Sequence, residues 1–202
     1  IEFPTLDTGY LTITNGYAGF IYKTTDSGNN WNSVYSNQGK LMYNTFFFNS
    51  TIGFGCGSPG IVKTTNGGVT WNIVYGGGAP TELYSISFVN QSTGFAVGST
   101  YSYPVYIQKI LRTTNGGNNW LSIAGYGSIG LSSVSFFDEN TGYACGSTFL
   151  FGTTNAGTNW FNCNLQDVFS NEAISTASNL GIVVGLKGSI FTSTNGGQNW
   201  AD

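Results

Sequence analysis

Short stretches in which apolar residues alternate with small polar residues recur along the chain and end in turns rich in Asn, Asp, Ser, Thr and Gly. In Ile86-Ser-Phe-Val-Asn-Gln-Ser-Thr-Gly-Phe95, for example, the alternation is followed by a polar turn and then by the apolar stretch Gly94-Phe-Ala-Val-Gly98. Alternation with a period of two is typical of β-strands, and polar clusters that end at glycine are typical of hairpin turns. A third apolar stretch and a fourth that begins at Trp follow in each unit, and no stretch has convincing helical periodicity. The pattern predicts four strands per unit and almost no helix.

The turn before each fourth strand has the same signature, Ser/Thr-Thr-Asp/Asn-x-Gly-x-x-Trp, in five places. Its third position is Asp or Asn, and its last position accounts for all five tryptophans: Asp26 and Trp31, Asn66 and Trp71, Asn115 and Trp120, Asn155 and Trp160, and Asn195 and Trp200. The Asp or Asn side chain is expected to accept hydrogen bonds from nearby backbone N–H groups, and the Gly two residues later to adopt a positive φ. Each Trp is expected to bury its ring against the neighbouring unit, so these ten residues are predicted to be structural.

The spacing of the tryptophans predicts the architecture. Successive tryptophans lie 40, 49, 40 and 40 positions apart, and a period of about 40 to 45 residues is typical of four-stranded propeller blades. We therefore predict one all-β domain over residues 1–202, a five-bladed β-propeller of four-stranded antiparallel blades. The blades are predicted at about residues 1–39, 40–79, 80–128, 129–168 and 169–202. Because propellers span roughly four to eight blades, the alternative is a fragment of a six- to eight-bladed propeller.

Charge and composition narrow the possible partners. Only 7% of the residues are charged, and six basic against nine acidic residues give a net charge of −3. Without a basic cluster the chain lacks the electrostatic basis for binding nucleic acid, and no stretch approaches the roughly 18 apolar residues of a membrane span. A surface built from Asn, Ser, Thr, Gly and Tyr differs from that of a typical cytosolic domain. These features predict an exported protein, extracellular or at the cell surface, and the opening at Ile1 indicates processing or trimming from a larger polypeptide or assembly.

Three cysteines and the absence of histidine limit the chemistry of the chain. Cys56 and Cys145 fall at matching repeat positions where other repeats have Ile or Val, so we predict buried small apolar residues. A disulfide between Cys145 and Cys163 is the alternative. Without histidine, and with scattered carboxylates, neither a transition-metal site nor a cofactor is predicted, whereas calcium in a loop is left open.

Two repeats carry extra residues between their second and third strands, at about residues 14–18 and 99–108. Loops at this position lie on the same rim of a propeller as the connections between blades. Five tyrosines are therefore predicted to share a ligand-binding surface: Tyr17, Tyr101, Tyr103, Tyr106 and Tyr126. Tyrosine suits recognition because it offers a flat apolar face and a hydroxyl at low entropic cost. The alternative is that these residues are solvated loop aromatics or packing residues.

The repeated turn resembles the Asp-box, the bacterial neuraminidase repeat. Together with the preceding Gly-Phe/Tyr-Ala-Val/Cys-Gly segment, it is similar to the propellers of the photosystem II assembly and stability factor family and to modules of exported bacterial surface proteins. The resemblance covers essentially the whole chain and implies a β-propeller. It does not imply one function, because the Asp-box occurs in sialidases, sortilin-like receptors and interaction modules alike.

The same resemblance allows enzyme classes to be tested. Sialidases are expected to hold the substrate carboxylate with three arginines, and the photosystem family is expected to depend on an arginine-rich patch. This chain has a single arginine, Arg112, at a position that predicts a strand-edge surface charge. A sialidase is effectively excluded. A glycoside hydrolase with a carboxylate pair drawn from Glu82, Asp167 and Glu172 is an alternative.

The sequence therefore predicts a binding or display module without catalytic residues on an exported bacterial protein. One loop rim would contact protein or glycan. The first alternative is a purely structural spacer of a large surface protein, and the second is the glycoside hydrolase.

Overall fold

The computed structural model describes residues 1–76, 81–123, 130–163, 165 and 171–201, which form five antiparallel sheets in chain order. The first sheet contains β1 (Gly9–Thr14), β2 (Ala18–Thr24) and β3 (Asn32–Gln38), and the second β4 (Met42–Phe47), β5 (Gly53–Gly57), β6 (Gly60–Thr64) and β7 (Asn72–Tyr75). The third contains β8 (Thr81–Phe88), β9 (Gly94–Ser102), β10 (Val105–Thr113) and β11 (Leu121–Ile123). The fourth contains β12 (Ser133–Phe136), β13 (Gly142–Gly146), β14 (Phe149–Thr153) and β15 (Phe161–Asn162), and the fifth β16 (Asn171–Ala177), β17 (Leu180–Gly185) and β18 (Ile190–Ser193). Within the described residues, the helical content is the 3₁₀ turn η1 (Leu186–Gly188), and no helix there is long and apolar enough to cross a bilayer.

The prediction of four-stranded units is confirmed for sheets two, three and four. In sheets one and five, one strand is reduced to an isolated bridge, between Glu2 and Tyr10 and between Thr192 and Ala201. Neighbouring strands along the chain pair with each other, so each sheet is a meander of hairpins.

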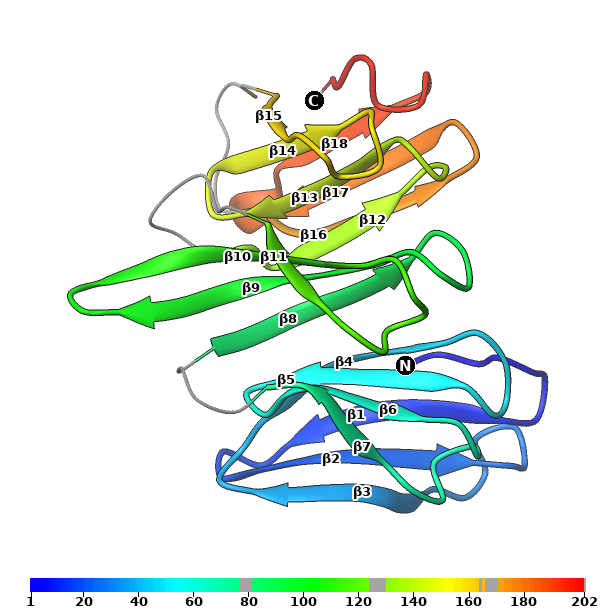
Figure 1. Cartoon of the computed structure of the whole chain (residues 1–202). Coiled ribbons are helices and arrows are strands. Elements are labelled where there is room, and N and C mark those ends of the chain that lie inside the picture. Colours follow the sequence, from blue (N-terminus) through cyan, green and yellow to red (C-terminus); the bar gives the residue numbers. More distant parts are fainter. Residues whose placement is uncertain (77–80, 124–129, 164, 166–170, 202) are drawn as a thin grey trace.

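The sheets pack in a row. Substantial contacts join β1 to β4, β4 to β8, β8 to β12 and β12 to β16, and the first and last sheets lie at opposite ends of the row (Figure 1). The five sheets therefore fit part of a larger propeller, which is the alternative that the sequence left open. The closed five-bladed ring is not formed, because no described packing of this kind brings sheet five onto sheet one.

Both end faces of the row are apolar. On sheet five, Leu180, Ile182 and Val184 point away from sheet four and are 58%, 48% and 39% exposed, whereas the intervening Val183 is fully buried. On sheet one, Ile13 is paired with Phe20 and is 45% exposed. Alternation on a strand that is buried on one face normally places polar residues on the other face. Exposed apolar faces of this kind are expected to be covered by another blade.

The segment Gly-Phe/Tyr-x-x-Gly at the second strand has a steric explanation. A Cβ on its first glycine would meet the Phe ring of the first strand, at 2.2 Å for Gly53 and Phe47 and at 2.5 Å for Gly94 and Phe88. A Cβ on its last glycine would meet the backbone of the first strand: a Cβ on Gly98 would lie 1.9 Å from the carbonyl oxygen of Glu82. The first strand shifts register close to this point, between Leu83 and Ser85. The two glycines thus allow the inner hairpin to close tightly over an aromatic ring.

The Asp-box turns have the hydrogen bonds that the sequence predicts. In the second box, the Gly68 N–H donates to Thr64 Oγ1 at 2.9 Å, and the Thr70 N–H donates to Asn66 Oδ1 at 2.9 Å. The same pair of bonds recurs in the other four boxes, at 2.8 to 3.0 Å. The predicted positive φ is also confirmed: it is 92°, 84°, 72°, 72° and 83° at Gly28, Gly68, Gly117, Gly157 and Gly197.

Each of the second to fifth boxes packs on an aromatic residue of the preceding sheet. The rings of Tyr10, Phe54, Phe95 and Tyr143 lie against the fourth or fifth residue of the next box, and Tyr10 and Tyr143 also donate a hydroxyl hydrogen bond to a box carbonyl. Three tryptophans, Trp71, Trp160 and Trp200, lie edge-on to an aromatic residue of the preceding sheet, as predicted. Trp120 is 7% exposed and belongs to the core cluster that includes Phe54 and Ile61 of the preceding sheet, although its aromatic pair, Phe88, belongs to its own sheet. Trp31, in the first sheet, contacts Phe3 of the same sheet.

The prediction that Arg112 is a surface charge at a strand edge was wrong. Its guanidinium lies 6.0 Å from the centroid of the Phe95 ring, and the side chain is half-buried between sheets three and four. A guanidinium can lie on an aromatic face because it is planar and weakly hydrated. Arg112 is therefore part of a junction between sheets.

All three cysteines are free, so the alternative of a disulfide between Cys145 and Cys163 is not formed. Cys56 and Cys145 are fully buried, as predicted for small apolar residues. Burial raises the pKa of the Cys145 thiol to about 12 and raises that of Cys56 further. Neither thiol is therefore ionised at neutral pH, which is typical of an inert structural cysteine.

Glu2 couples the stability of the first sheet to pH. Its Oε1 accepts a hydrogen bond from the Phe47 N–H at 3.1 Å, whereas its buried Oε2 has no hydrogen-bond partner in the described structure. Burial raises the pKa of this carboxyl group from an ordinary value of 4.5 to about 7. Because the folded state binds this proton more tightly than the unfolded state, the stabilisation is complete below about pH 4.5 and is lost as the pH rises through 7.

We therefore expect Glu2→Gln, which mimics the neutral carboxyl group, to match the wild type near pH 4.5 and to exceed its free energy of unfolding by about 1–3 kcal/mol at pH 8. Urea unfolding at a series of pH values measures this difference. Glu139→Gln, in an exposed hairpin turn, is the control. A difference between wild type and Glu2→Gln that does not change with pH would contradict the prediction.

Candidate functional site

The rim at which second and third strands connect is hollowed in three adjoining places. Hollows of about 540, 380 and 350 Å³ share residues with one another: Ser58 and Thr81 line the first two, and Glu82 lines the second and third. We call this surface the tyrosine rim and define it by its bordering residues Tyr17, Tyr84, Tyr101 and Tyr106 together with Glu82. Three separate sheets contribute to one continuous surface.

Three of the five predicted tyrosines border this surface. Tyr17 is 85% exposed in the turn between β1 and β2, where Asn15 Oδ1 accepts hydrogen bonds from the backbone N–H groups of Tyr17 and Ala18. Tyr101 and Tyr106 are cross-strand partners, and their ring centroids are 5.0 Å apart. The two rings therefore form an aromatic pair beside the hollows.

The other two predicted tyrosines are not placed there. Tyr103 is 87% exposed at the tip of the β9–β10 hairpin and borders none of the three hollows. Tyr126 lies outside the described residues. Residues 99–108, expected as a loop, instead extend β9 and β10, and the hairpin projects from the row of sheets (Figure 1).

Sequence reasoning missed the polar centre of the rim. Tyr84 Oη donates a hydrogen bond to Glu82 Oε2 at 2.6 Å, and the ring of Tyr43 lies 5.0 Å from that of Tyr84. Burial and the hydrogen bond to Glu82 raise the pKa of Tyr84 to about 12; burial and the charge of Glu82 raise that of Tyr43. Both phenols therefore stay protonated and act as hydrogen-bond donors. Tyr43 and Tyr84 each come directly after a buried apolar residue of a first strand, Met42 or Leu83. This shared position in the repeat is the signal by which the sequence could have identified them.

Positive charge also borders the hollows. Lys40 lines the 380 Å³ hollow together with Glu82, and Lys109 lines the 540 Å³ hollow together with Tyr101. The rim thus combines aromatic faces, which are enriched in recognition surfaces, with one carboxylate and two ammonium groups.

The predicted carboxylate pair is not assembled among the described residues. Glu82 lies in β8 and Glu172 in β16, on sheets that do not pack against each other, and Asp167 lies outside the described residues. No group of three or more His, Cys, Asp or Glu in the described part of the chain is arranged to hold a metal ion.

Solved structures with this fold include glycoside hydrolases. The chain superposes on the GH74 enzyme from Niastella koreensis with a TM-score of 0.71, 21% identity and 96% of this chain covered, and on the GH74 xyloglucanase from Xanthomonas campestris with a TM-score of 0.68, 12% identity and 93% covered. It spans only 36% of either enzyme chain. At these identities the similarity shows the propeller fold and nothing about activity.

The chain is also similar to YCF48 bound to a D1 peptide, with a TM-score of 0.50, 16% identity, and coverage of 98% of this chain and 79% of that one. A search of curated proteins gave no match. The family model described as photosynthesis system II assembly factor YCF48 matches residues 78–202, which is more than half of the sequence. The chain therefore belongs to the family of the photosynthesis system II assembly factor YCF48.

Proposed function

We propose that this chain is a binding module without catalytic residues on an exported bacterial protein, and that the tyrosine rim holds a segment of a partner protein. The observation that carries the proposal is the continuity of the three hollows, which share Ser58, Thr81 and Glu82 beneath exposed tyrosine rings. The low proportion of charged residues, 7%, supports export.

Protein is favoured over glycan by two features. YCF48 has been solved with a D1 peptide bound, so a member of this family binds a peptide. In the rim itself, Glu82, Lys40 and Lys109 offer charges of both signs, which can pair with the charged side chains of a peptide but not with a neutral sugar. A role in photosystem assembly would need a different contact surface, because the single arginine of this chain lies between sheets three and four.

We also propose that further blades complete the ring to six to eight. Support comes from the exposed apolar face formed by Leu180, Ile182 and Val184 on sheet five. Each of the other four sheets packs against the sheet that follows it, so a further blade would cover this face in the same way. A closed ring of this chain alone, seen by small-angle scattering, would contradict the proposal.

Alanine substitution tests the binding surface. The double variant Tyr101→Ala and Tyr106→Ala is expected to lose about tenfold or more in affinity for a ligand found on an array of surface-protein peptides and glycans, because tyrosines that a partner covers are common binding hot spots. Biolayer interferometry measures the loss. Tyr103→Ala on the same hairpin is the matched control and is expected to have no effect.

Three outcomes would contradict the proposal. An equal loss in Tyr103→Ala would show that the hairpin tip, not the rim, makes the contact. The absence of any ligand would favour the structural spacer. Turnover of a glycan on the array would favour the glycoside hydrolase.

A further inference from the structure

Three of the four junctions between consecutive sheets have a cationic side chain on the third strand of the repeating unit. Each cation is the cross-strand partner of the aromatic residue that supports the next box, in the pairs Lys23 and Tyr10, Lys63 and Phe54, and Arg112 and Phe95. The cationic group lies 5.6, 5.4 and 6.0 Å from the respective ring centroid. The two lysines also donate hydrogen bonds to the fourth residue of the next box, at 2.9 Å to the Gly67 oxygen and 2.7 Å to the Gly116 oxygen.

At the junction of sheets four and five this position is Gly152. Its cross-strand partner is Tyr143, whose hydroxyl donates a hydrogen bond of 2.7 Å to the Gly197 oxygen, so the aromatic half of the arrangement is present. A Cβ on Gly152 would lie 2.7 Å from the Phe161 ring, so this ring covers the position from which a side chain would extend. A Cβ on Gly196, the fourth residue of the fifth box, would meet nothing within 4 Å.

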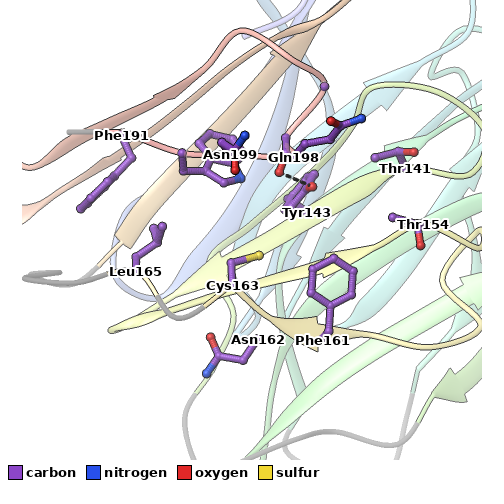
Figure 2. Close-up of a pocket in the computed structure, with 13 residues that line it drawn as sticks. Thr141, Tyr143, Thr154, Phe161, Asn162, Cys163, Leu165, Phe191, Gln198 and Asn199 are labelled. Carbon is purple, nitrogen blue, oxygen red and sulfur yellow. Dashed lines mark hydrogen bonds between the residues drawn. The ribbon is translucent and has the colours of Figure 1, made fainter.

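A hollow of about 800 Å³ occupies this junction (Figure 2). Its walls include the aromatic side chains of Tyr143, Phe161 and Trp200 and the box residues Gly196 and Gly197, and no residue that lines its described part is Asp, Glu, Lys or Arg. Phe161, which is 47% exposed, pairs with Gly152 across the strands and leans over it. The junction of sheets three and four has a hollow of the same volume, but Arg112 lines that one.

We propose that the hollow between sheets four and five binds a lysine or arginine side chain of a partner protein. The partner would supply the cation that the chain itself provides at the other three junctions. Aromatic faces attract an ammonium or guanidinium group, and the attraction grows as the cation loses water. Box carbonyls at the equivalent positions already accept hydrogen bonds from ammonium groups in this protein, and the net charge of −3 favours approach of a basic partner. This site is separate from the tyrosine rim, because it is built from box residues and fourth-strand residues.

The test uses n-butylammonium and n-butylguanidinium as probes, with 1-butanol as the neutral probe of similar length. Binding is followed by the ¹⁵N–¹H signals of the tryptophan indoles, and the Trp200 signal is assigned as the one that is lost in Trp200→Phe. We expect both cations to shift the Trp200 signal in a saturable manner and to bind about two- to fivefold more tightly than 1-butanol. A lysine-containing tripeptide is expected to behave like n-butylammonium, and its norleucine analogue like 1-butanol. Equal shifts by cations and 1-butanol would overturn the proposal, because the hollow would then be only apolar.

Two variants exchange the features of the junctions. Gly152→Lys combined with Phe161→Leu reproduces sheet three, where Arg112 pairs with Leu121, and is expected to abolish the Trp200 shift. Arg112→Gly reproduces sheet four and is expected to create a second site, reported by the Trp160 indole, which lies 6.2 Å from Phe95. Unchanged binding in the first variant would overturn the proposal, as would the absence of a second site in the second variant. Unfolding in urea verifies that both variants are folded.

Discussion

Replacing Phe54 by alanine is expected to lower the free energy of unfolding by about 3–5 kcal/mol, the usual cost of deleting a fully buried aromatic side chain. Phe54 is fully buried and stacks on Phe88 of the next sheet with ring centroids 4.6 Å apart. Its ring edge also lies directly under Gly117 of the third Asp-box, and Lys63 lies over its face. One substitution therefore removes the support of a whole junction.

Urea unfolding followed by tryptophan fluorescence measures this loss. Val69→Ala, in the second box, is the matched control, because Val69 is 78% exposed and surface substitutions usually change stability by less than 0.5 kcal/mol. A loss below about 1 kcal/mol for Phe54→Ala would show that the junction between sheets two and three does not depend on this ring.

The second large effect is expected for Gly98→Ala, at about 3 kcal/mol, the upper end of the cost of overpacking. The added methyl group would lie 1.9 Å from the Glu82 carbonyl oxygen and 2.8 Å from Leu83 Cα. Both are backbone atoms, so no side-chain rotation relieves the overlap. The inner strand β8 must shift instead, and with it Glu82 and Tyr84 in the tyrosine rim.

Gly39→Ala separates this overlap from backbone strain. Gly39 has a φ of +73° and nothing within 4 Å of an added Cβ, so its substitution is expected to cost only about 1 kcal/mol. Denaturant unfolding compares the two variants. If Gly39→Ala were as costly as Gly98→Ala, the explanation of Gly98 by contact with the inner strand would be wrong.

Much of the local structure could be predicted because its causes lie within a few residues. The Asp-box is closed by hydrogen bonds between residues no more than four positions apart, such as Gly68 to Thr64. The strands follow from alternation, and the burial of Cys56 and Cys145 follows from their position in the repeat. For the candidate site, the loop position was enough to place Tyr17, Tyr101 and Tyr106 on one rim, because every blade connects its second and third strands at the same end.

The polar centre of the rim depended on contacts between sheets. Tyr43 and Tyr84 meet only because β4 packs against β8, and the period of the repeat does not say which side chains of adjacent inner strands touch. Arg112 was misassigned for the same reason: its partner Phe95 is close in the sheet, but the burial of the pair comes from the next sheet.

The sequence by itself determined the repeating unit of this protein: its strands, its capped glycine turn and the tryptophan that begins its last strand. Those features depend on local geometry and on a period of two, both of which are written in the order of the residues. Only the tertiary structure decided that the five sheets form an open row, that three hollows adjoin through Ser58, Thr81 and Glu82, and that no described residue lining the junction at Gly152 is a cation. Ring closure depends on the small rotation between packed sheets, and a hollow depends on which side chains from neighbouring sheets fill the same space; neither quantity is contained in any single repeat.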